Sequence, residues 1–462
     1  MKKNIAFMKL NKFFVVILGV MTMGIGASNA QEVITIQQAV DSTLKNNLQI
    51  KQAQLSASLT EESLLQSKNS LLPTLNASTS PSLNFGRGLD QNTFQVVNQT
   101  SFFLNGSVSS NVDLFNGLTK INTIKQNKIL LEADQTNINK IKNDLILQVV
   151  TSYLQVLFNT DLLRASQEQL AVANQTLKRE QELINVGDKT LADLSQAKAQ
   201  MATAELNVTN AQNALEISYI SLAQLMERQP TNKFVVQAPV YNDMVGVDTK
   251  VDPNEVYSSA LKTFPDIALF NLRTKAAEKA ISIARGSYLP SIGMGGSLSS
   301  SYSYQFGYDA VNPVTGQPLK QSSFSQQFSD RFGQGLGLSI RIPIFNGYNA
   351  RSGVRQAKIR YQNAQLSEQL NKNNLQKIIF QASADLKAAE SRYTSNTNTY
   401  LATKDAFFVI EQRYNVGLVN SLDYSTARTN MNKAETDMIQ AKYDLIFRAK
   451  VIDYYLGKQI TF

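Results

Sequence analysis

Any chemistry in this chain must rest on side chains other than histidine and cysteine, because its 462 residues include neither. This absence excludes Ser-His and Cys-His nucleophiles, ordinary zinc sites and disulfides. A clustered pair of carboxylates could still support catalysis, but the sequence shows no such pair. We therefore expect no enzyme, no cofactor and no soft-metal site.

Two carboxylates recur at a fixed place in a repeated motif. Asp193 lies six residues after Gly187 of one N-V-G sequence, and Asp423 lies six residues after Gly417 of another. The two aspartates are 230 residues apart (423 − 193). Such a long repeat predicts two related halves, which we assign to 31–253 and 254–462.

Two further pairs of motifs align the halves. "SLLPTL" at Ser70–Leu75 matches "SYLPSI" at Ser287–Ile292, and "DLFNG" at Asp113–Gly117 matches "PIFNG" at Pro343–Gly347. The first pair is offset by 217 residues and the second by 230, so the halves differ by 13 residues between these motifs. We place the difference in 86–101 and 307–330, which we interpret as surface loops.

Residues 1–30 have the form of a secretory signal peptide. Four lysines precede an apolar run at 13–27, and Ser28-Asn29-Ala30 has the small-x-small pattern of a cleavage site. A membrane anchor is the alternative, but the run is shorter than the ~20 residues that a span needs. Without this segment the chain has 41 basic (45 − 4) and 36 acidic residues. The bases are scattered, so we expect no nucleic-acid binding.

Alternation with period two predicts four strands. They are placed at 74–85, 102–115, 290–306 and 328–345, each with one apolar and one polar or small face. This pattern is typical of a membrane β-barrel, although a half-buried strand of a soluble sheet shows it too. The prediction of export favours the membrane, and so does an aromatic girdle at the membrane interface. The predicted girdle consists of Tyr302, Tyr304, Phe306 and Phe332.

Three glycines at 333, 335 and 337 could suggest a phosphate-binding loop. They fall inside the pattern of the fourth strand, and no helix begins directly after them. We interpret them as small residues on the inner face of a tight barrel.

The remaining segments read as helices. Helices are predicted at 35–72 and 253–287, where Thr35 and Asp252 precede them as caps, and helical hairpins at 118–226 and 348–456. Each hairpin begins with 67 residues without proline, which is about 100 Å of helix. A seven-residue apolar stripe along them indicates coiled-coil packing. The N-V-G glycines would allow the tight turn between antiparallel helices.

The predicted elements require an assembly. Four strands cannot close a barrel, and open sheet edges are not tolerated in lipid, so several chains must combine. The helices are far longer than a bilayer is thick, and we therefore expect them to stand in the periplasm.

The duplicated helix–strand–strand–helix plan, the two "LP" and two "FNG" motifs and the "RYNVG…SLDYSTA" turn resemble TolC-like outer-membrane efflux proteins. The resemblance covers essentially the whole mature chain. It implies a homotrimer in which three chains of four strands form one outer-membrane β-barrel of twelve strands. A long periplasmic coiled-coil barrel of helices would continue this barrel, with small equatorial segments near 228–251 and 457–462.

The resemblance also implies a function. The trimer would be a passive duct that takes small molecules such as drugs from a periplasmic adaptor and an inner-membrane RND or ABC pump to the exterior. An alternative is the same duct serving ATP-driven secretion of proteins or peptides. A second alternative, from another class, is a secreted coiled-coil structural protein, which would not require girdled strands.

The N-V-G turns would then form the periplasmic tip. We predict that the adaptor docks on a tip surface made of Val186, Gly187, Asp188, Val416, Gly417 and Leu418. The alternative is that these residues only build the turns, which applies most to the glycines. Leu418 favours docking, because it is an apolar residue at an exposed tip.

Family members narrow the periplasmic mouth with inward acidic rings. Asp423 aligns with one such position, and Asp193 is its repeat partner. Thr426 stands where a second aspartate often follows, which argues against a strong double ring. We therefore predict one cation-selective ring of Asp423. The alternative is an aspartate that only stabilises the start of its helix through the helix dipole.

Overall fold

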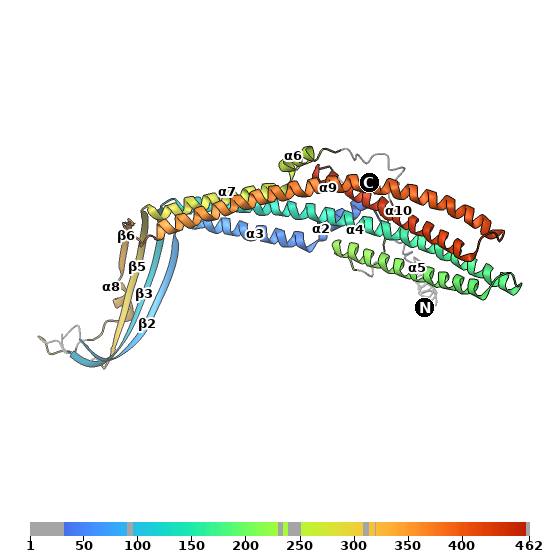
Figure 1. Ribbon diagram of the computed structural model, residues 1–462. Coiled ribbons are helices and arrows are strands. Elements are labelled where there is room, and N and C mark those ends of the chain that lie inside the picture. Colours follow the sequence, from blue (N-terminus) through green and yellow to red (C-terminus); the bar gives the residue numbers. More distant parts are fainter. Residues whose placement is uncertain are drawn as a thin grey trace, which may run out of the picture.

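The computed structural model describes residues 32–89, 96–229, 234–238, 251–307, 314–318 and 320–458. The predicted signal peptide lies outside the described residues, as do parts of the segments predicted near 228–251 and 457–462. Figure 1 shows an elongated molecule with its strands at one end and the turns of two long helical hairpins at the other.

Four strands form an antiparallel sheet in the order β2–β3–β5–β6. They span Thr74–Leu89, Val96–Asn116, Ser291–Phe306 and Gly333–Arg341, respectively. The pairing of β2 with β3 continues to Leu89 and Val96. Much of the segment 86–101, which was predicted as a loop, is therefore strand. The backbone hydrogen bonds between β2 and β3 extend beyond the residues whose side chains alternate between apolar and polar.

The fourth strand was predicted too long. A short helix, α8 (Phe324–Asp330), occupies its predicted first residues and part of the predicted loop 307–330. Ser323 caps this helix, since its Oγ accepts a hydrogen bond from the Gln326 backbone N–H at 3.4 Å. Phe332, predicted on the strand, lies between α8 and β6.

The register gives the sheet two chemically different faces. Leu75, Ser110, Gly296 and Leu336 pair in one row across the four strands, so they share a face. Following the same register, this face carries most of the large apolar side chains. They are Leu75, Leu83, Phe85, Phe102, Leu104, Val108, Val112, Ile292, Met294, Leu298, Tyr302, Tyr304, Phe306, Leu336, Leu338 and Ile340. The opposite face is mainly serine, asparagine and glycine.

The two longest helices each have 67 residues, α4 at Thr119–Asn185 and α9 at Asn349–Asn415. Each is followed by a helix of 35 residues, α5 at Leu191–Leu225 and α10 at Ser421–Tyr455. No helix in the described part of the chain has both the length and the apolar character needed to cross a membrane.

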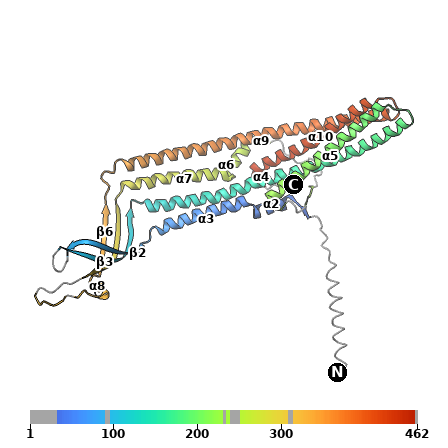
Figure 2. The ribbon, with the colours of Figure 1, turned by 90° about the horizontal axis from the view of Figure 1, so that it is seen from below.

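Near the sheet, four helices lie side by side in the order α3–α4–α7–α9, as Figure 2 shows. The outer helix α3 spans Leu48–Asn69, and α7 spans Pro265–Arg285. Four helices thus meet the four-stranded sheet, with α3 and α9 at the two edges of the helical layer.

The predicted helix at 35–72 is two helices. Helix α2 (Ile36–Asn46) ends at Asn47, whose backbone leaves the helical conformation. The Asn47 side chain caps α3 by accepting a hydrogen bond from the Gln49 N–H at 2.8 Å, and its amide donates to the Leu225 carbonyl at 3.2 Å. Both contacts favour a break that the apolar pattern alone did not indicate.

The predicted helix at 253–287 is also divided. Helix α6 (Pro253–Thr263) and helix α7 are separated by Phe264, which is extended. Pro265 explains the break, because a proline disfavours the helical conformation of the residue before it.

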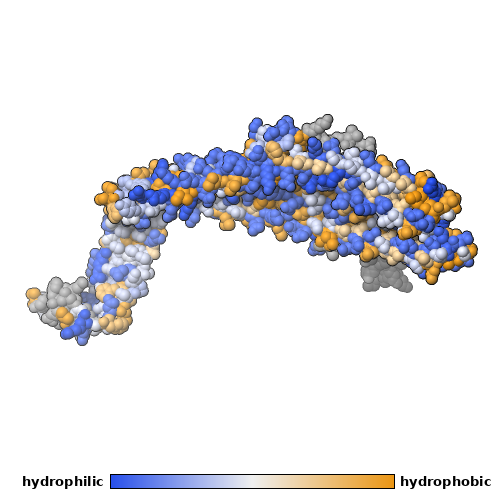
Figure 3. Space-filling model, viewed as in Figure 1, coloured by the Kyte–Doolittle hydropathy of each residue, from blue (hydrophilic) through white to orange (hydrophobic). Residues whose placement is uncertain are grey.

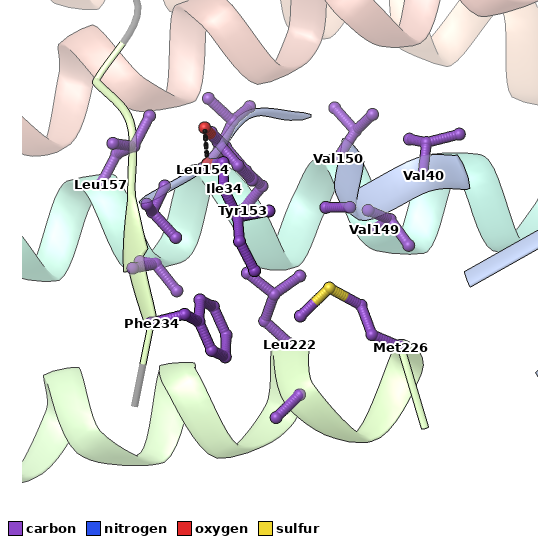
Figure 4. Close-up of a cluster of buried hydrophobic side chains, with 14 of the residues drawn as sticks. Ile34, Val40, Val149, Val150, Tyr153, Leu154, Leu157, Leu222, Met226 and Phe234 are labelled. Carbon is purple, nitrogen blue, oxygen red and sulfur yellow. Dashed lines mark hydrogen bonds between the residues drawn. The ribbon is translucent and has the colours of Figure 1, made fainter. Parts of the chain in front are cut away.

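A buried cluster holds the N-terminal elements against the middle of the first hairpin (Figure 4). Strand β1 (Glu32–Ile34) pairs in parallel with β4 (Phe234–Val236), and both pack on α4 and α5. The Tyr153 hydroxyl donates to the carbonyls of Ile34 at 3.1 Å and Gln237 at 2.7 Å. Burial raises the pKa of Tyr153 to about 12, so this hydroxyl stays a donor.

Candidate functional site

Both hairpins turn at the end of the molecule farthest from the strands (Figure 1). In the first turn, Gly187 has a left-handed backbone with φ of 79°, and in the second Gly417 has φ of 76°. The N–H of Asp188 donates to the Leu183 carbonyl at 3.0 Å, and that of Leu418 to the Arg413 carbonyl at 2.9 Å. These bonds satisfy carbonyls at the helix ends, as in the Schellman motif.

The tip is unusually apolar for an exposed turn. Val186, Val416 and Leu418 of the predicted tip surface are 70–76% exposed, and Asp188 is exposed beside them. The structure adds Leu191 and Leu422, which are 74% and 64% exposed. The sequence signal for these two was an apolar residue in the first turn after each cap. Figure 3 shows hydrophobic side chains gathered at this end of the molecule.

Asp193 joins the two hairpins. Its Oδ2 accepts hydrogen bonds from the Thr190 backbone N–H at 3.1 Å and hydroxyl at 2.7 Å, which caps α5. Its Oδ1 accepts a hydrogen bond from the Ser421 hydroxyl at the start of α10. The bond from Ser421, followed by those from Thr190, holds the pKa of the Asp193 carboxyl below its ordinary value.

Asp423 and Thr426 occupy a different environment. The Asp423 carboxylate is exposed in the first turn of α10, and its backbone N–H donates to the capping Asn420 side chain at 2.8 Å. Thr426 is also exposed, and its hydroxyl donates within the helix to the Leu422 carbonyl at 2.8 Å. Both side chains are therefore accessible to solutes at the tip of the hairpins.

A buried contact that the sequence did not reveal lies just behind the tip. The Tyr414 hydroxyl of α9 donates to the carboxylate of Glu180 on α4, a residue that is 1% exposed. The other Glu180 oxygen, Oε2, is buried without a hydrogen-bond partner. Tyr424 stacks on Tyr414 at 4.4 Å between ring centroids, and the Lys189 amine lies 4.5 Å from the Tyr414 ring.

The Tyr414 hydroxyl remains protonated at this contact. Burial, followed by the hydrogen bond to Glu180, raises its pKa above the ordinary value for tyrosine. A neutral hydroxyl therefore donates to the side chain of Glu180, and this buried hydrogen bond joins α9 to α4.

Arg428 forms a second buried connection. The residue is 6% exposed, and its guanidinium reaches from α10 to α4, where it donates to the Thr176 hydroxyl at 3.2 Å and the Gln169 carbonyl at 3.0 Å. A polar groove of about 410 Å³ lies beside it between the hairpins. Gln169, Gln200, Asn207, Ser425 and Lys433 are among the residues that line it.

The predicted girdle residues lie at the end of the molecule that is formed by the strands. Tyr302, Tyr304 and Phe306 share the apolar face of β5, and the rings of Tyr304 and Phe306 contact each other with centroids 5.1 Å apart. Phe332 is 54% exposed before β6 begins. Within the described residues, no group of three or more acidic side chains could hold a metal ion.

The chain is similar in sequence to proteins of the bacterial outer membrane. A family model described as "Outer membrane efflux protein" matches residues 39–227 and 256–457. The outer membrane efflux protein BepC of Brucella suis is 20% identical over 424 residues, covering 90% of this chain and 85% of its own. The toxin and drug export protein A of Aggregatibacter actinomycetemcomitans is 22% identical, covering 89% and 83%.

The fold also has a solved counterpart. The structure of CusC, described in terms of folding and transmembrane channel formation, superimposes with a TM-score of 0.76 and 18% identity. The alignment covers 92% of each chain.

Proposed function

Because the chain belongs to the outer membrane efflux protein family, we propose that it forms a passive duct that carries small molecules across the outer membrane. The resemblance to TolC-like proteins is confirmed, and with it the location in the outer membrane. In the proposed system a periplasmic adaptor and an inner-membrane pump deliver the substrate. The chain itself performs no catalytic step and needs no cofactor.

The two chemically different faces of the sheet support this function most directly. The apolar face would contact lipid, and the face of serine, asparagine and glycine would line the water-filled lumen. A leucine such as Leu336, which is 80% exposed in the single chain, is then covered by acyl chains. The long hairpins would continue the lumen into the periplasm.

We propose a homotrimer, because the two edges of the sheet need partners. Strand β2 lies at one edge and β6 at the other, and lipid offers no hydrogen bonds to an open edge. Pairing β6 of one copy with β2 of the next closes a barrel of three times four strands.

The edge helices support the same assembly. Leu48, Leu55 and Leu59 are exposed on α3, with spacings of seven and four residues. Ile359, Leu366 and Leu370 are exposed on α9 with the same two spacings. Matching stripes of this kind fit coiled-coil packing between neighbouring copies.

At the opposite end, we propose that the adaptor docks on the tip surface. The apolar side chains there are exposed in the chain, and the contact would cover them. Gly187 and Gly417 contribute by setting the shape of the turns. Asp423 would form the cation-selective ring at the mouth, with Asp193 and Thr426 beside it.

A second candidate is the same duct serving ATP-driven secretion of proteins or peptides. The name of the relative from Aggregatibacter includes both toxin and drug export, which keeps this candidate open. The secreted coiled-coil structural protein finds no support, because the family is one of outer-membrane proteins.

A photo-crosslinking amino acid at Leu418 tests the docking site in living cells. We expect it to capture an adaptor that co-purifies with a proton-driven pump. Capture of an adaptor of an ATP-driven exporter would favour secretion instead. The control position is Thr209, exposed midway along α5. If the assembled protein captures no periplasmic partner at Leu418, the assignment of the tip is wrong.

A further inference from the structure

The edge of β5 is covered by two different structures along its length. Strand β6 pairs with β5 from Ser291 to Ser299. Beyond Ser299, strand β5 continues to Phe306. On the edge that faces away from β3, the hydrogen-bond partners of this part of β5 come from α8 and from the residues before α8.

Where β6 no longer pairs with β5, two glutamine side chains bind the free backbone groups of β5. Gln327 of α8 donates from Nε2 to the Ser303 carbonyl at 3.0 Å and accepts from the Ser303 N–H at 3.1 Å. Gln321 makes the same pair of bonds with Gln305, at 2.6 Å and 2.9 Å. Each amide thus satisfies one N–H and one carbonyl, as a paired strand residue would. The Ser300 hydroxyl adds a bond to the Phe328 carbonyl at 2.6 Å.

An aromatic row connects α8 with the apolar face of the sheet. Phe102 and Tyr302, neighbours on that face, have ring centroids 6.3 Å apart. Tyr302 contacts Phe324 at 5.1 Å, and Phe324 stacks on Phe328 at 5.5 Å. The two phenylalanines are four residues apart and therefore lie on one side of the helix. They remain 50% and 40% exposed, so the described chain leaves much of both rings uncovered.

The length of β6 places α8 relative to the bilayer. Its nine residues match the roughly 9–11 residues with which a tilted strand crosses the hydrocarbon core. Because α8 lies beyond the first residue of β6, on the side away from the periplasmic helices, it falls at the outer interface (Figure 1). Aromatic side chains with one apolar and one wet surrounding are favoured at that level.

We propose that α8 is an interfacial helix bound to the lipids of the outer leaflet. Phe324 and Phe328 insert at the boundary between headgroups and acyl chains, while Gln321 and Gln327 seal the β5 edge behind them. The occupant of this apolar surface is lipid because the surface continues the apolar face of the sheet without interruption. This inference rests on the proposed function, in which that face contacts the membrane.

Tryptophan fluorescence tests the proposal cleanly, because the chain contains no tryptophan. The variant Phe328→Trp is reconstituted in phosphatidylcholine vesicles whose acyl chains carry bromine at a shallow or a deep position. We expect blue-shifted emission, and a loss of fluorescence that is larger with shallow than with deep bromines. Phe324→Trp provides a second reporter on the same helix.

Two controls separate the helix from the barrel. Phe103→Trp reports on the polar face at the same level, since Phe103 pairs with Ser303, and bromolipid should leave its fluorescence unchanged. Leu336→Trp reports on the apolar face of β6 and should be quenched. If bromolipid quenches the fluorescence of Leu336→Trp but not that of Phe324→Trp and Phe328→Trp, α8 does not contact lipid, while the proposed barrel stands. Absence of quenching at 336 as well would overturn the proposed barrel and the inference with it.

Discussion

At the scale of single residues, the tip glycines are required by their backbone and not by crowding. A Cβ added at Gly417 would meet no atom within 4 Å, yet its φ of 76° is strained for any other residue type. The turn-building alternative therefore explains both glycines. It does not explain the exposed valines and leucines around them, which are the residues available for a partner.

We predict that Gly417→Ala destabilises the protein by about 1–2 kcal/mol, the cost of a left-handed backbone with a Cβ. The matched control is Gly353→Ala inside α9, where a Cβ also meets no atom and the backbone is helical. There we expect stabilisation of about 1 kcal/mol. Denaturant unfolding followed by circular dichroism measures both changes, and equal effects would refute this explanation of the turn.

Asp423 and its repeat partner Asp193 differ in what their carboxylates can do. The two carboxylate oxygens of Asp193 accept hydrogen bonds from Thr190 and Ser421, whereas the Asp423 carboxylate is exposed. We predict that Asp423→Asn lowers the cation selectivity of single channels in planar bilayers, because the ring at the mouth loses its charge. Thr426→Ala should leave selectivity unaltered. Unchanged selectivity in Asp423→Asn would show that this aspartate only stabilises its helix.

At the scale of elements, the two hairpins are joined by several polar contacts, of which the bond between Tyr414 and Glu180 is buried and those of Arg428 are half-buried. Glu180 is the most consequential, because it is a buried carboxylate with one hydrogen bond from Tyr414 and one oxygen without a partner. Such a group is stable only while its donor is in place. The relative position of the two hairpins thus depends on residues 234 positions apart in the sequence (414 − 180).

We predict that Tyr414→Phe costs about 1–3 kcal/mol of stability, the penalty for leaving a buried polar group without its hydrogen-bond partner. In a double-mutant cycle with Glu180→Gln, the two effects should not add, since both variants alter one bond. The free energy of unfolding of the four proteins gives the coupling. Strictly additive effects would mean that the two side chains do not interact in the assembled protein.

The elements themselves differ in how well the sequence predicted them. The long helices were predictable because they contain no proline and keep one apolar stripe. Helix α8 was not, because its role depends on two glutamines that contact the β5 backbone from outside the strand pattern. The contacts of Glu180 and Arg428 were also beyond prediction, since they join residues that meet only when the hairpins pack together.

At the scale of the whole molecule, the chain separates its tasks along its length. The sheet offers one apolar and one polar face, the helices offer stripes at both edges, and the tip offers exposed apolar side chains. A single chain leaves all of these surfaces uncovered. Lipid, two further copies and an adaptor together would cover them, which is the physical reason for expecting an assembled duct.

In the proposed duct, the polar face of the sheet lines the channel. Because the chain has no cysteine, Ser297→Cys and Leu298→Cys place single thiols on opposite faces of β5. We predict that a charged, membrane-impermeant thiol reagent changes the single-channel conductance of Ser297→Cys and leaves that of Leu298→Cys unchanged. If the reconstituted protein conducts no ions, or if only the thiol of Leu298→Cys responds, the polar face does not line a channel.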